Sequence, residues 1–249
     1  MRQFGLIGYP LSHSFSQGFF AEKFKRENID DAQYANFPIA SIREFAALWE
    51  QDVHLMGLNV TIPYKKEVIP FLQYPSSVVA AIHACNCIRK YNNELYGYNT
   101  DVIGFEKSLA PYLKPYHTHA LILGTGGAAA AVEWVMNKLN IAYKFVSRTN
   151  GMNCIGYDQL TNDIIQQHRL IINTSPVGMY PNVNDAPSIP YEAITAQHHL
   201  FDLIYNPSVT QFLAKGEQQG ATIQNGLEML HIQAEESWKI WTATTPLLQ

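Results

Sequence analysis

A lysine and an aspartate are the residues of this sequence best suited to moving a proton. Lys65 follows the segment Asn59-Val-Thr61-Ile-Pro-Tyr, and Asp101 closes the run Asn99-Thr-Asp. An ammonium group donates a proton to a carbonyl oxygen that receives a hydride, and it stabilises the negative charge that develops there. An unperturbed lysine has a pKa of about 10.4, so Lys65 is expected to be charged at neutral pH. We therefore expect Lys65 and Asp101 to act as a catalytic pair, with the carboxylate orienting the ammonium group.

Four polar clusters near the ends of predicted strands are candidates to bind a substrate: residues 13–16, residues 59–66, Asn86 and residues 99–101. The side chains expected to take part are Ser14, Ser16, Thr61, Asn86 and Asp101. In open α/β sheets, ligands bind at the carboxyl ends of the strands, so these clusters are expected to converge on one cleft. Two serines suit a carboxylate, and the other side chains suit ring hydroxyls. The combination predicts a small, hydroxyl-rich substrate that carries a carboxylate.

Each cluster also has an explanation that involves no ligand. Ser-Phe-Ser after a turn and Asn-Thr-Asp before a helix both resemble helix caps. Asn59 and Thr61 are able to satisfy loop backbone, and Lys65 with Lys66 is a candidate for a solvated pair. The presence of all four clusters in one chain, rather than any one of them, favours a substrate site.

A glycine loop predicts a nucleotide site. Residues 119–123 form a predicted strand, Gly124-Thr-Gly126-Gly127 follows, and an alanine-rich helix begins at Ala128 and Ala129. Glycines allow a tight turn in which backbone N–H groups and the positive end of the helix meet a diphosphate. The small residue Ala129 allows close packing of helix and strand. The alternative is a plain tight turn between a strand and a helix.

The end of the next predicted strand favours NADP over NAD. An NAD site carries an acidic residue there, which accepts the ribose 2′-hydroxyl. This chain has Ser147-Arg148-Thr149 instead. Arg148 can pair with a 2′-phosphate, and no carboxylate repels that phosphate. The alternative is that Arg148 is a solvated surface cation.

The elements that position these residues alternate between strand and helix. Ser41 and Glu44 form a predicted capping box for a helix that runs to about residue 51, and Asn92-Asn93 predicts a hairpin turn. Strands are predicted over residues 4–8, 34–37, 57–62, 85–90, 95–98, 119–123, 143–147, 170–173, 199–202 and 221–224. Helices are predicted over residues 17–28, 101–113, 128–139 and 227–242.

This alternation favours parallel sheets covered by helices on both faces. We expect two α/β domains with a cleft between them: a substrate-binding domain over residues 1–103, and a Rossmann-type dinucleotide-binding domain over residues 104–226. The last helix, within residues 227–249, has no strand after it and is expected to return to the first domain.

Composition excludes several other classes of protein. The formal net charge of −4 leaves no basic surplus for nucleic acid, and no stretch is apolar enough to span a membrane. Cys85, Cys87 and Cys154 suit neither a disulfide scaffold nor a metal framework, so we expect a cytoplasmic protein without a metal. The sequence leaves a homodimer open.

At this point the chain resembles the shikimate dehydrogenase family over nearly its whole length. The resemblance rests on an ordered series of motifs. They are Gly8-Tyr-Pro-Leu-Ser-His13-Ser14-Phe-Ser16, Gly57-Leu-Asn59-Val-Thr61-Ile-Pro63-Tyr-Lys65, Asn86, Gly97-Tyr-Asn-Thr-Asp101, Gly124-Thr-Gly126-Gly127-Ala-Ala129, Ser147-Arg148-Thr149, Asn173-Thr174-Ser-Pro-Val-Gly178-Met179, Asp202-Leu-Ile-Tyr205-Asn-Pro207 and Asn225-Gly226-Leu-Glu-Met229-Leu-His-Ile-Gln233.

The resemblance implies an NADP-dependent oxidoreductase of aromatic amino-acid biosynthesis that reduces 3-dehydroshikimate to shikimate, with Lys65 and Asp101 as the catalytic pair. It implies substrate contacts from Ser14, Ser16, Thr61, Lys65, Asn86, Asp101, Tyr205 and Gln233. It implies cofactor contacts from Gly124, Gly126, Gly127, Ala128, Ala129, Ser147, Arg148, Thr149, Thr174, Gly226 and Met229.

The chain departs from the family pattern at a few positions, and three rival functions stay open. Gln17 stands where proline is usual, Cys87 replaces threonine after Asn86, with Cys85 before it, and Ser147 replaces asparagine. The rivals are an NAD-dependent quinate/shikimate dehydrogenase, a methylene-tetrahydrofolate dehydrogenase of the same architecture, and an NADP-binding regulator without catalysis. The absence of an acidic residue near position 148 speaks against the NAD-dependent enzyme. The paired serines speak against the methylene-tetrahydrofolate dehydrogenase, and the intact Lys65 and Asp101 speak against the regulator.

Overall fold

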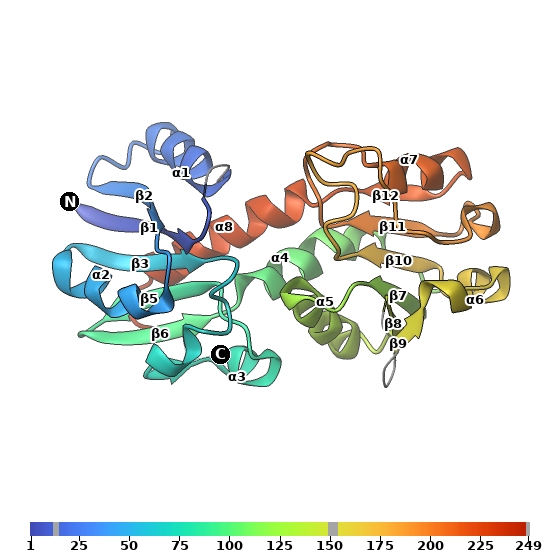
Figure 1. Cartoon of the computed structure of the whole chain (residues 1–249). Coiled ribbons are helices and arrows are strands. Elements are labelled where there is room, and N and C mark those ends of the chain that lie inside the picture. The colour runs from blue at the N-terminus through green and yellow to red at the C-terminus, as the bar shows by residue number, and fades with distance from the viewer. Residues whose placement is uncertain (12–14, 149–153, 248–249) are drawn as a thin grey trace. The chain divides into compact units, whose positions relative to one another are not determined.

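The chain folds into two compact units. The computed structural model describes residues 1–11, 15–148 and 154–247 of the 249. One unit comprises Met1–Thr100 with Gln233–Gln249, and the other comprises Asp101–Ile232. The chain therefore enters the second unit at the start of α4 and leaves it within α8 (Figure 1). The functional division expected from the sequence, into residues 1–103 with 227–249 and residues 104–226, stays a prediction.

The first unit is built on a mixed six-stranded sheet in the order β2-β1-β3-β5-β6-β4. Its strands are β1 (Arg2–Gly8), β2 (Ala32–Pro38), β3 (Leu55–Val60), β4 (Tyr74–Pro75), β5 (Cys87–Tyr91) and β6 (Glu94–Tyr98). The predicted hairpin is confirmed, because Asn92 and Asn93 both have positive φ, as a two-residue turn requires. The expectation of a parallel sheet is wrong for this unit, since the hairpin makes β5 antiparallel to both β3 and β6.

The helices of the first unit pack against its sheet, partly through aromatic side chains. They are α1 (Phe15–Arg26), α2 (Phe45–Gln51), α3 (Ser77–Ile82) and the second part of α8 (Leu227–Thr242). The Trp241 ring of α8 stacks on Phe4 of β1 at 4.9 Å, and its Nε1 donates to the Ile88 carbonyl. A side chain at Gly57 would collide with that ring, so glycine at this position allows α8 to pack closely against β3. The predicted capping box of Ser41 and Glu44 is confirmed, although one turn of 3₁₀-helix precedes α2.

The second unit has a parallel six-stranded sheet in the order β12-β11-β10-β7-β8-β9. Its strands are β7 (His119–Leu123), β8 (Ala142–Ser147), β9 (Cys154–Gly156), β10 (Leu170–Asn173), β11 (His199–Asp202) and β12 (Thr222–Gln224). Its helices are α4 (Thr100–Leu109), α5 (Gly127–Lys138), α6 (Asn162–Gln167), α7 (Gln211–Gln218) and the first part of α8. This is the strand order of a dinucleotide-binding fold. Successive strands are added on one side of the first strand, and from the fourth strand on they are added on its other side, so the order switches between β7 and β10.

Four elements have the limits predicted from the sequence, and two strands were missed. The strands β7, β10 and β11 and the helix α8 have the predicted bounds. The missed strands are β4 and β9, which have two and three residues and are too short to show an alternation of apolar and polar side chains. Among the described residues, no helix combines the length and apolar character that crossing a bilayer requires.

Candidate active site

Several predicted substrate residues meet at one edge of the first sheet because of how its strands run. The strands β1, β3 and β6 end at this edge, and the antiparallel strand β5 begins there, since Cys87 pairs with Asn59 on one side and Tyr98 on the other. Residues that follow β3, precede β5 and follow β6 are therefore neighbours. Asn86, which was predicted to lie inside a strand, reaches the edge as the residue before β5.

Backbone hydrogen bonds bring Thr61, Lys65 and Asn86 to that edge. The Thr61 amide donates to the Ile7 carbonyl over 2.9 Å, and the Val60 amide donates to the Asn86 carbonyl over 2.9 Å. The Lys65 carbonyl accepts from the Cys85 amide over 2.8 Å. Lys65 is half-buried, whereas Lys66 is exposed, so the two lysines do not form one equally solvated pair.

Ser16 and Gln233 reach the same unit from its helices. Ser16 is buried in the first turn of α1 and hydrogen-bonds the Tyr34 hydroxyl, which lowers a tyrosine pKa that burial raises. Gln233 is buried on α8, and its Oε1 accepts from the Thr100 hydroxyl over 3.4 Å. The structure thus places four predicted substrate residues, Ser16, Thr61, Asn86 and Gln233, in one unit.

Two other predicted residues are placed less completely. Ser14 lies outside the described residues. Asp101 is the first residue of the second unit and follows Thr100 at the start of α4. Its pairing with Lys65 therefore stays a prediction.

A buried chain of polar side chains lies behind these residues and was not anticipated. The Tyr34 hydroxyl donates to Asn59 Oδ1 over 3.0 Å, and Asn59 Nδ2 donates to Ser237 Oγ over 2.9 Å. Thr100 Oγ1 lies 3.3 Å from Ser237 Oγ, and the Thr100 amide donates to Asn86 Oδ1 over 2.6 Å. The sequence did offer one sign, because Ser237 stands four positions after Gln233 and therefore on the same helix face.

The positions where the chain departs from the family pattern have local explanations. Gln17 is on the first turns of α1, and its Oε1 accepts from Asn36 Nδ2 over 3.0 Å. Cys85 and Cys87 are both fully buried, and the Cys85 thiol donates to the Cys87 carbonyl over 3.4 Å. Burial raises the pKa of the Cys87 thiol, which keeps it protonated.

In the second unit, the glycine loop has the geometry that a diphosphate needs. Gly124 has φ +107°, a backbone conformation that other residues rarely adopt, and its amide donates to the Val146 carbonyl over 2.8 Å. Gly126 and Gly127 are exposed, and a side chain at either would meet open space. Ala128 is half-buried and Ala129 is buried at the start of α5, so the helix begins close to the sheet. The amides of this turn are thus left accessible beside a helix N-terminus, which suits a dinucleotide.

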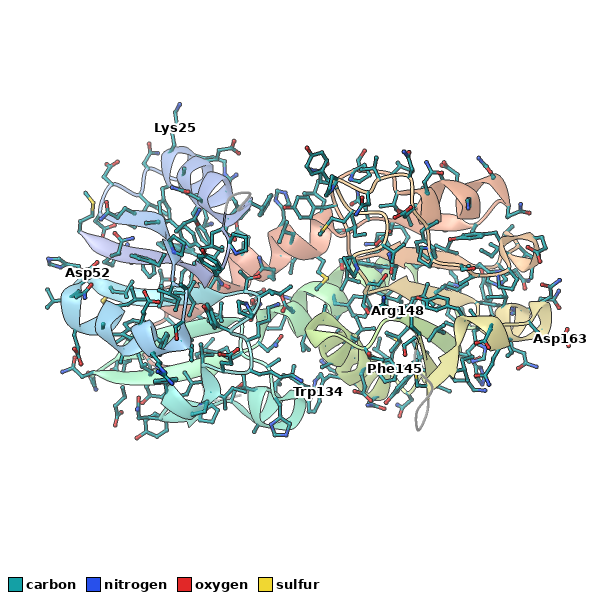
Figure 2. All side chains as sticks on the ribbon, in the orientation of Figure 1. Lys25, Asp52, Trp134, Phe145, Arg148 and Asp163 are labelled. Carbon is teal, nitrogen blue, oxygen red and sulfur yellow. The ribbon has the colours of Figure 1, made fainter. Side chains whose placement is uncertain are left out.

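The end of β8 carries a cation and no carboxylate. Ser147 is the last residue of β8 and accepts from the Cys154 thiol over 3.4 Å. Arg148 follows it and is exposed (Figure 2). Burial raises the pKa of Tyr157, and the positive charge of Arg148 opposes part of that rise. The guanidinium therefore lies close enough to Tyr157 to interact with it electrostatically. Thr149 lies outside the described residues.

The remaining predicted cofactor residues follow β10 and β12 at the same edge of the second sheet, and the predicted substrate residue Tyr205 follows β11. Thr174 is anchored to the glycine loop, since its amide and its hydroxyl both donate to the Leu123 carbonyl, over 2.9 and 2.8 Å. The Gly226 amide donates to the Ile204 carbonyl over 3.1 Å, and backbone atoms of Leu203 leave no room for a side chain at Gly226. Met229 is buried on α8, and Tyr205 is exposed.

Asp202, to which the motifs gave no role, is a buried carboxylate at this edge. The Asp202 side chain accepts from Thr210 Oγ1 over 2.6 Å, from Asn173 Nδ2 over 3.1 Å and from the Ile204 amide over 3.1 Å. Burial raises its pKa to about 6, and these hydrogen bonds oppose that rise. Its partners come from the segments that follow β10 and β11, so Asp202 holds those two segments together.

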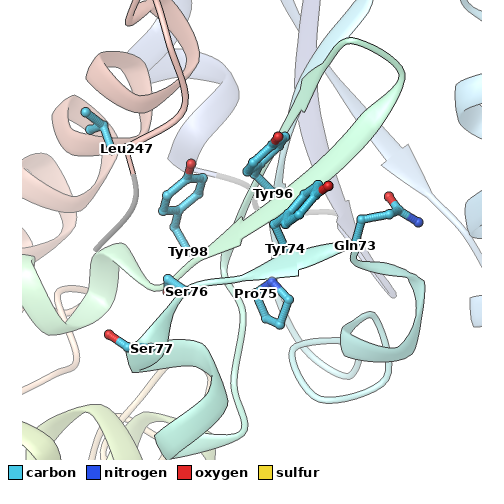
Figure 3. Close-up of a pocket in the computed structure, with 8 residues that line it drawn as sticks. All are labelled: Gln73, Tyr74, Pro75, Ser76, Ser77, Tyr96, Tyr98 and Leu247. Atoms are coloured by element: carbon cyan, nitrogen blue, oxygen red, sulfur yellow. The ribbon is translucent and has the colours of Figure 1, made fainter.

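A pocket of the first unit lies apart from the predicted substrate residues. It has a volume of about 260 Å³ and lies against β4 and β6, beside Leu247 (Figure 3). Tyr74, Tyr96 and Tyr98 are in its wall, with serine, proline and glutamine and no charged side chain. The wall therefore offers no cation for a carboxylate, and we assign it no part in the candidate site.

The chain matches known proteins along nearly its full length. Residues 6–88 match the family model described as the shikimate dehydrogenase substrate binding domain. A protein of Staphylococcus haemolyticus named shikimate dehydrogenase (NADP(+)) is 34% identical over 255 residues, which cover 98% of this chain and 94% of that protein. A protein of Nostoc with the same name is 36% identical over 95% of this chain and 89% of its own length.

Solved structures agree with the sequence relatives. A shikimate dehydrogenase from Peptoclostridium difficile has a TM-score of 0.83 at 34% identity, covering 98% of this chain and 93% of its own. A shikimate 5-dehydrogenase from Thermus thermophilus, solved in complex with NADP(H) and shikimate, has a TM-score of 0.86 at 26% identity, covering 99% and 95%. The resemblance therefore extends through both units.

Proposed function

The chain belongs to the shikimate dehydrogenase family, and we propose that it catalyses the reversible, NADPH-dependent reduction of 3-dehydroshikimate to shikimate. One observation carries the choice of cofactor. The dinucleotide-type turn at Gly124–Gly127 is followed, one strand later, by exposed Arg148 instead of a carboxylate. Two relatives named shikimate dehydrogenase (NADP(+)) align with 98% and 95% of this chain, which supports the rest of the proposal.

On the cofactor side, the turn and the end of β8 would share the binding of NADP. The amides at Gly126, Gly127 and Ala128 would hold the diphosphate, and Arg148 with Ser147 would hold the 2′-phosphate. Gly226 and Met229, after β12, would contact the nicotinamide. Thr174, which is hydrogen-bonded to the residue before the glycine loop, would contact the cofactor beside that loop. When bound, the reduced nicotinamide supplies the hydride.

On the substrate side, the first unit would hold a carboxylated and hydroxylated ring. Ser14 and Ser16 would bind the carboxylate, and Thr61, Asn86 and Gln233 would bind hydroxyl oxygens. Lys65 would donate a proton to the carbonyl oxygen as the hydride arrives, and Asp101 would orient the ammonium group and a substrate hydroxyl. Tyr205 would lie near the substrate.

We also propose a setting for the enzyme. A reducing cytoplasm suits a chain whose three cysteines are thiols, two of them fully buried. The partner is a small molecule, and a homodimer is the assembly to test. Light scattering on the purified chain would give its mass in solution, and a mass of one chain would exclude the dimer.

The test of the proposed function is oxidation of NADPH, followed by its near-ultraviolet absorbance, with 3-dehydroshikimate as substrate. Parallel reactions use NADH in place of NADPH, and 3-dehydroquinate in place of 3-dehydroshikimate. Rapid turnover with NADPH and 3-dehydroshikimate alone is the expected result. Comparable rates with NADH or 3-dehydroquinate would move the chain to the quinate/shikimate dehydrogenases. A chain that binds NADPH and turns over neither substrate would be a regulator or an enzyme for another substrate.

A further inference from the structure

A serine on α8 lies at the centre of the buried polar chain behind the predicted substrate residues. Ser237 is fully buried, and its hydroxyl donates to the Gln233 carbonyl over 2.9 Å, one helical turn back. Toward Asn59 the Ser237 Oγ is an acceptor, whereas between Ser237 and Thr100 either hydroxyl is able to donate its single proton. Ser237 Oγ accepts from Asn59 Nδ2 over 2.9 Å and faces Thr100 Oγ1 at 3.3 Å. Ser237 thus joins β3, the start of α4 and α8.

These contacts fix which end of each neighbouring amide points in which direction. Asn59 turns its Oδ1 to the Tyr34 hydroxyl and its Nδ2 to Ser237. Asn86 turns its Oδ1 to the Thr100 amide at 2.6 Å and its Nδ2 to Thr100 Oγ1 at 3.0 Å. Water does not compete for these hydrogen bonds, because four of the residues are at most 4% exposed: Asn59, Asn86, Thr100 and Ser237.

Gln233 is oriented in the same way through Thr100. Its Oε1 is the end that faces Thr100 Oγ1, at 3.4 Å. The oxygen and nitrogen of an amide lie on opposite sides of its carbon, so Gln233 Nε2 points away from Thr100. Gln233, through Nε2, and Asn86, through the one Nδ2 hydrogen that does not bond Thr100, would then offer N–H groups rather than carbonyl oxygens to a ligand. Such donors suit hydroxyl, carbonyl or carboxylate oxygen atoms.

We propose that Ser237 is a positioning residue of the substrate site: by holding Asn59 and Thr100, it keeps Asn86 and Gln233 turned so that their amide N–H groups meet oxygen atoms of the bound substrate. This inference rests on the proposed function, because it assigns Asn86 and Gln233 to the substrate. Ser237 itself touches neither substrate nor cofactor. Its removal therefore changes how well the substrate is held and leaves the groups that react in place.

The test compares Ser237→Ala with the unmodified chain in steady-state kinetics and in calorimetric titration with shikimate. We expect the KM and the Kd for shikimate to rise about 5- to 20-fold, because two hydrogen-bond donors lose their fixed orientation. The kcat is expected to stay within about 3-fold, and the KM for NADP within about 2-fold, since the reacting groups and the second unit are untouched.

A matched control separates positioning from loss of a buried hydroxyl. Ser108 of α4 is also fully buried, and its hydroxyl also donates to a carbonyl of its own helix, that of Phe105, over 3.1 Å. Ser108→Ala should leave the KM for shikimate unchanged. An equal rise of KM in both variants would overturn the proposal, as would an unchanged KM in a folded Ser237→Ala protein.

A second pair of variants serves if Ser237→Ala does not fold. Thr100→Val removes the hydroxyl that connects Ser237 with Gln233, and Thr100→Ser keeps it. We expect Thr100→Val to raise the Kd for shikimate about as much as Ser237→Ala would, and Thr100→Ser to restore it. Equal Kd values for Thr100→Val and Thr100→Ser would reject the role of this network.

An unmodified chain that neither binds nor oxidises shikimate would reject the proposed function. Normal kinetics in both the unmodified and the variant chains would reject only the role of Ser237.

Discussion

Asn59 Nδ2 donates a hydrogen bond to Ser237 Oγ over 2.9 Å, although 178 positions separate the two residues in the chain. Asn59 is on β3, near the middle of the first sheet, and Ser237 is on the last helix. The polar interior of the first unit is therefore complete only after the chain has built the second unit and returned. A fragment of residues 1–100 would lack Ser237 and Gln233, together with the Trp241 ring that packs at Gly57.

Lys65→Ala should lower kcat by about 100- to 10,000-fold and change KM much less, because a proton donor to the developing alkoxide acts mainly in the transition state. Steady-state kinetics in both directions measure the effect. The neighbouring variant Lys66→Ala is the control, since Lys66 is exposed whereas Lys65 is half-buried. A kcat that survives Lys65→Ala would remove this lysine from the chemistry.

Two glycines of the nucleotide loop should respond to alanine in different ways. Gly124→Ala should destabilise the fold by about 1–3 kcal/mol, because φ is +107° there. Gly126→Ala should leave the stability of the cofactor-free protein nearly unchanged, since Gly126 has φ −77° and open space around it. It should nevertheless weaken NADP binding at least about 10-fold, because the new methyl group would occupy the approach of the diphosphate.

Thermal unfolding and NADP titration of both glycine variants measure these effects. Tight NADP binding by a stable Gly126→Ala protein would show that the diphosphate lies elsewhere. A Gly124→Ala protein as stable as the unmodified chain would contradict the argument from backbone conformation.

Arg148→Ala should raise the KM for NADPH about 10-fold or more and leave the KM for NADH nearly unchanged, because only NADPH carries the 2′-phosphate that the guanidinium would pair with. Kinetics with each cofactor measure the ratio. Arg169→Ala provides the control, since Arg169 precedes β10 and is at the opposite edge of the same sheet. Equal changes for NADPH and NADH would mean that Arg148 does not discriminate between them.

Stability should fall as the pH drops from about 6.5 toward 4. Burial lowers the pKa of His117, His168, His198 and His199 in the second unit, that of His199 to about 4. The unfolded chain, with histidine pKa values of about 6.5, binds more protons than the folded chain in this window, so acid favours unfolding. Asp202 has the opposite sign, because its pKa is raised to about 6, and it offsets part of the loss.

His199→Gln isolates one contribution to this pH dependence. The unfolded and folded pKa values of His199 differ by about 2.5, and each pKa unit corresponds to about 1.36 kcal/mol. The variant should therefore reduce the loss of unfolding free energy between pH 6.5 and 4 by about 3 kcal/mol. Denaturant unfolding at a series of pH values measures the slope. His54→Gln, at an exposed position, is the control variant. An identical slope in the His199 variant would refute this source of acid sensitivity.

Local patterns were sufficient for many elements and for part of the candidate site. The strand, glycine turn and helix at residues 119–138 could be predicted because each depends on neighbouring residues: apolar side chains, glycine at a positive φ, and alanines where a helix packs closely. The bounds of α8 and the turn at Asn92 and Asn93 have local causes of the same kind. The family resemblance likewise depends on motifs that are each short and contiguous.

Folding in three dimensions was needed for what depends on distant residues. The pairing of β5 with β3 places Asn86 at the edge of the sheet through the start of its strand, and no local pattern reveals that these two strands are neighbours. Asn59 and Ser237 look like ordinary polar residues in the sequence, and the same holds for Asp202 with its partner Asn173. Each becomes significant through a partner tens of positions away, because burial removes water and leaves the polar group dependent on whichever side chain the fold brings to it.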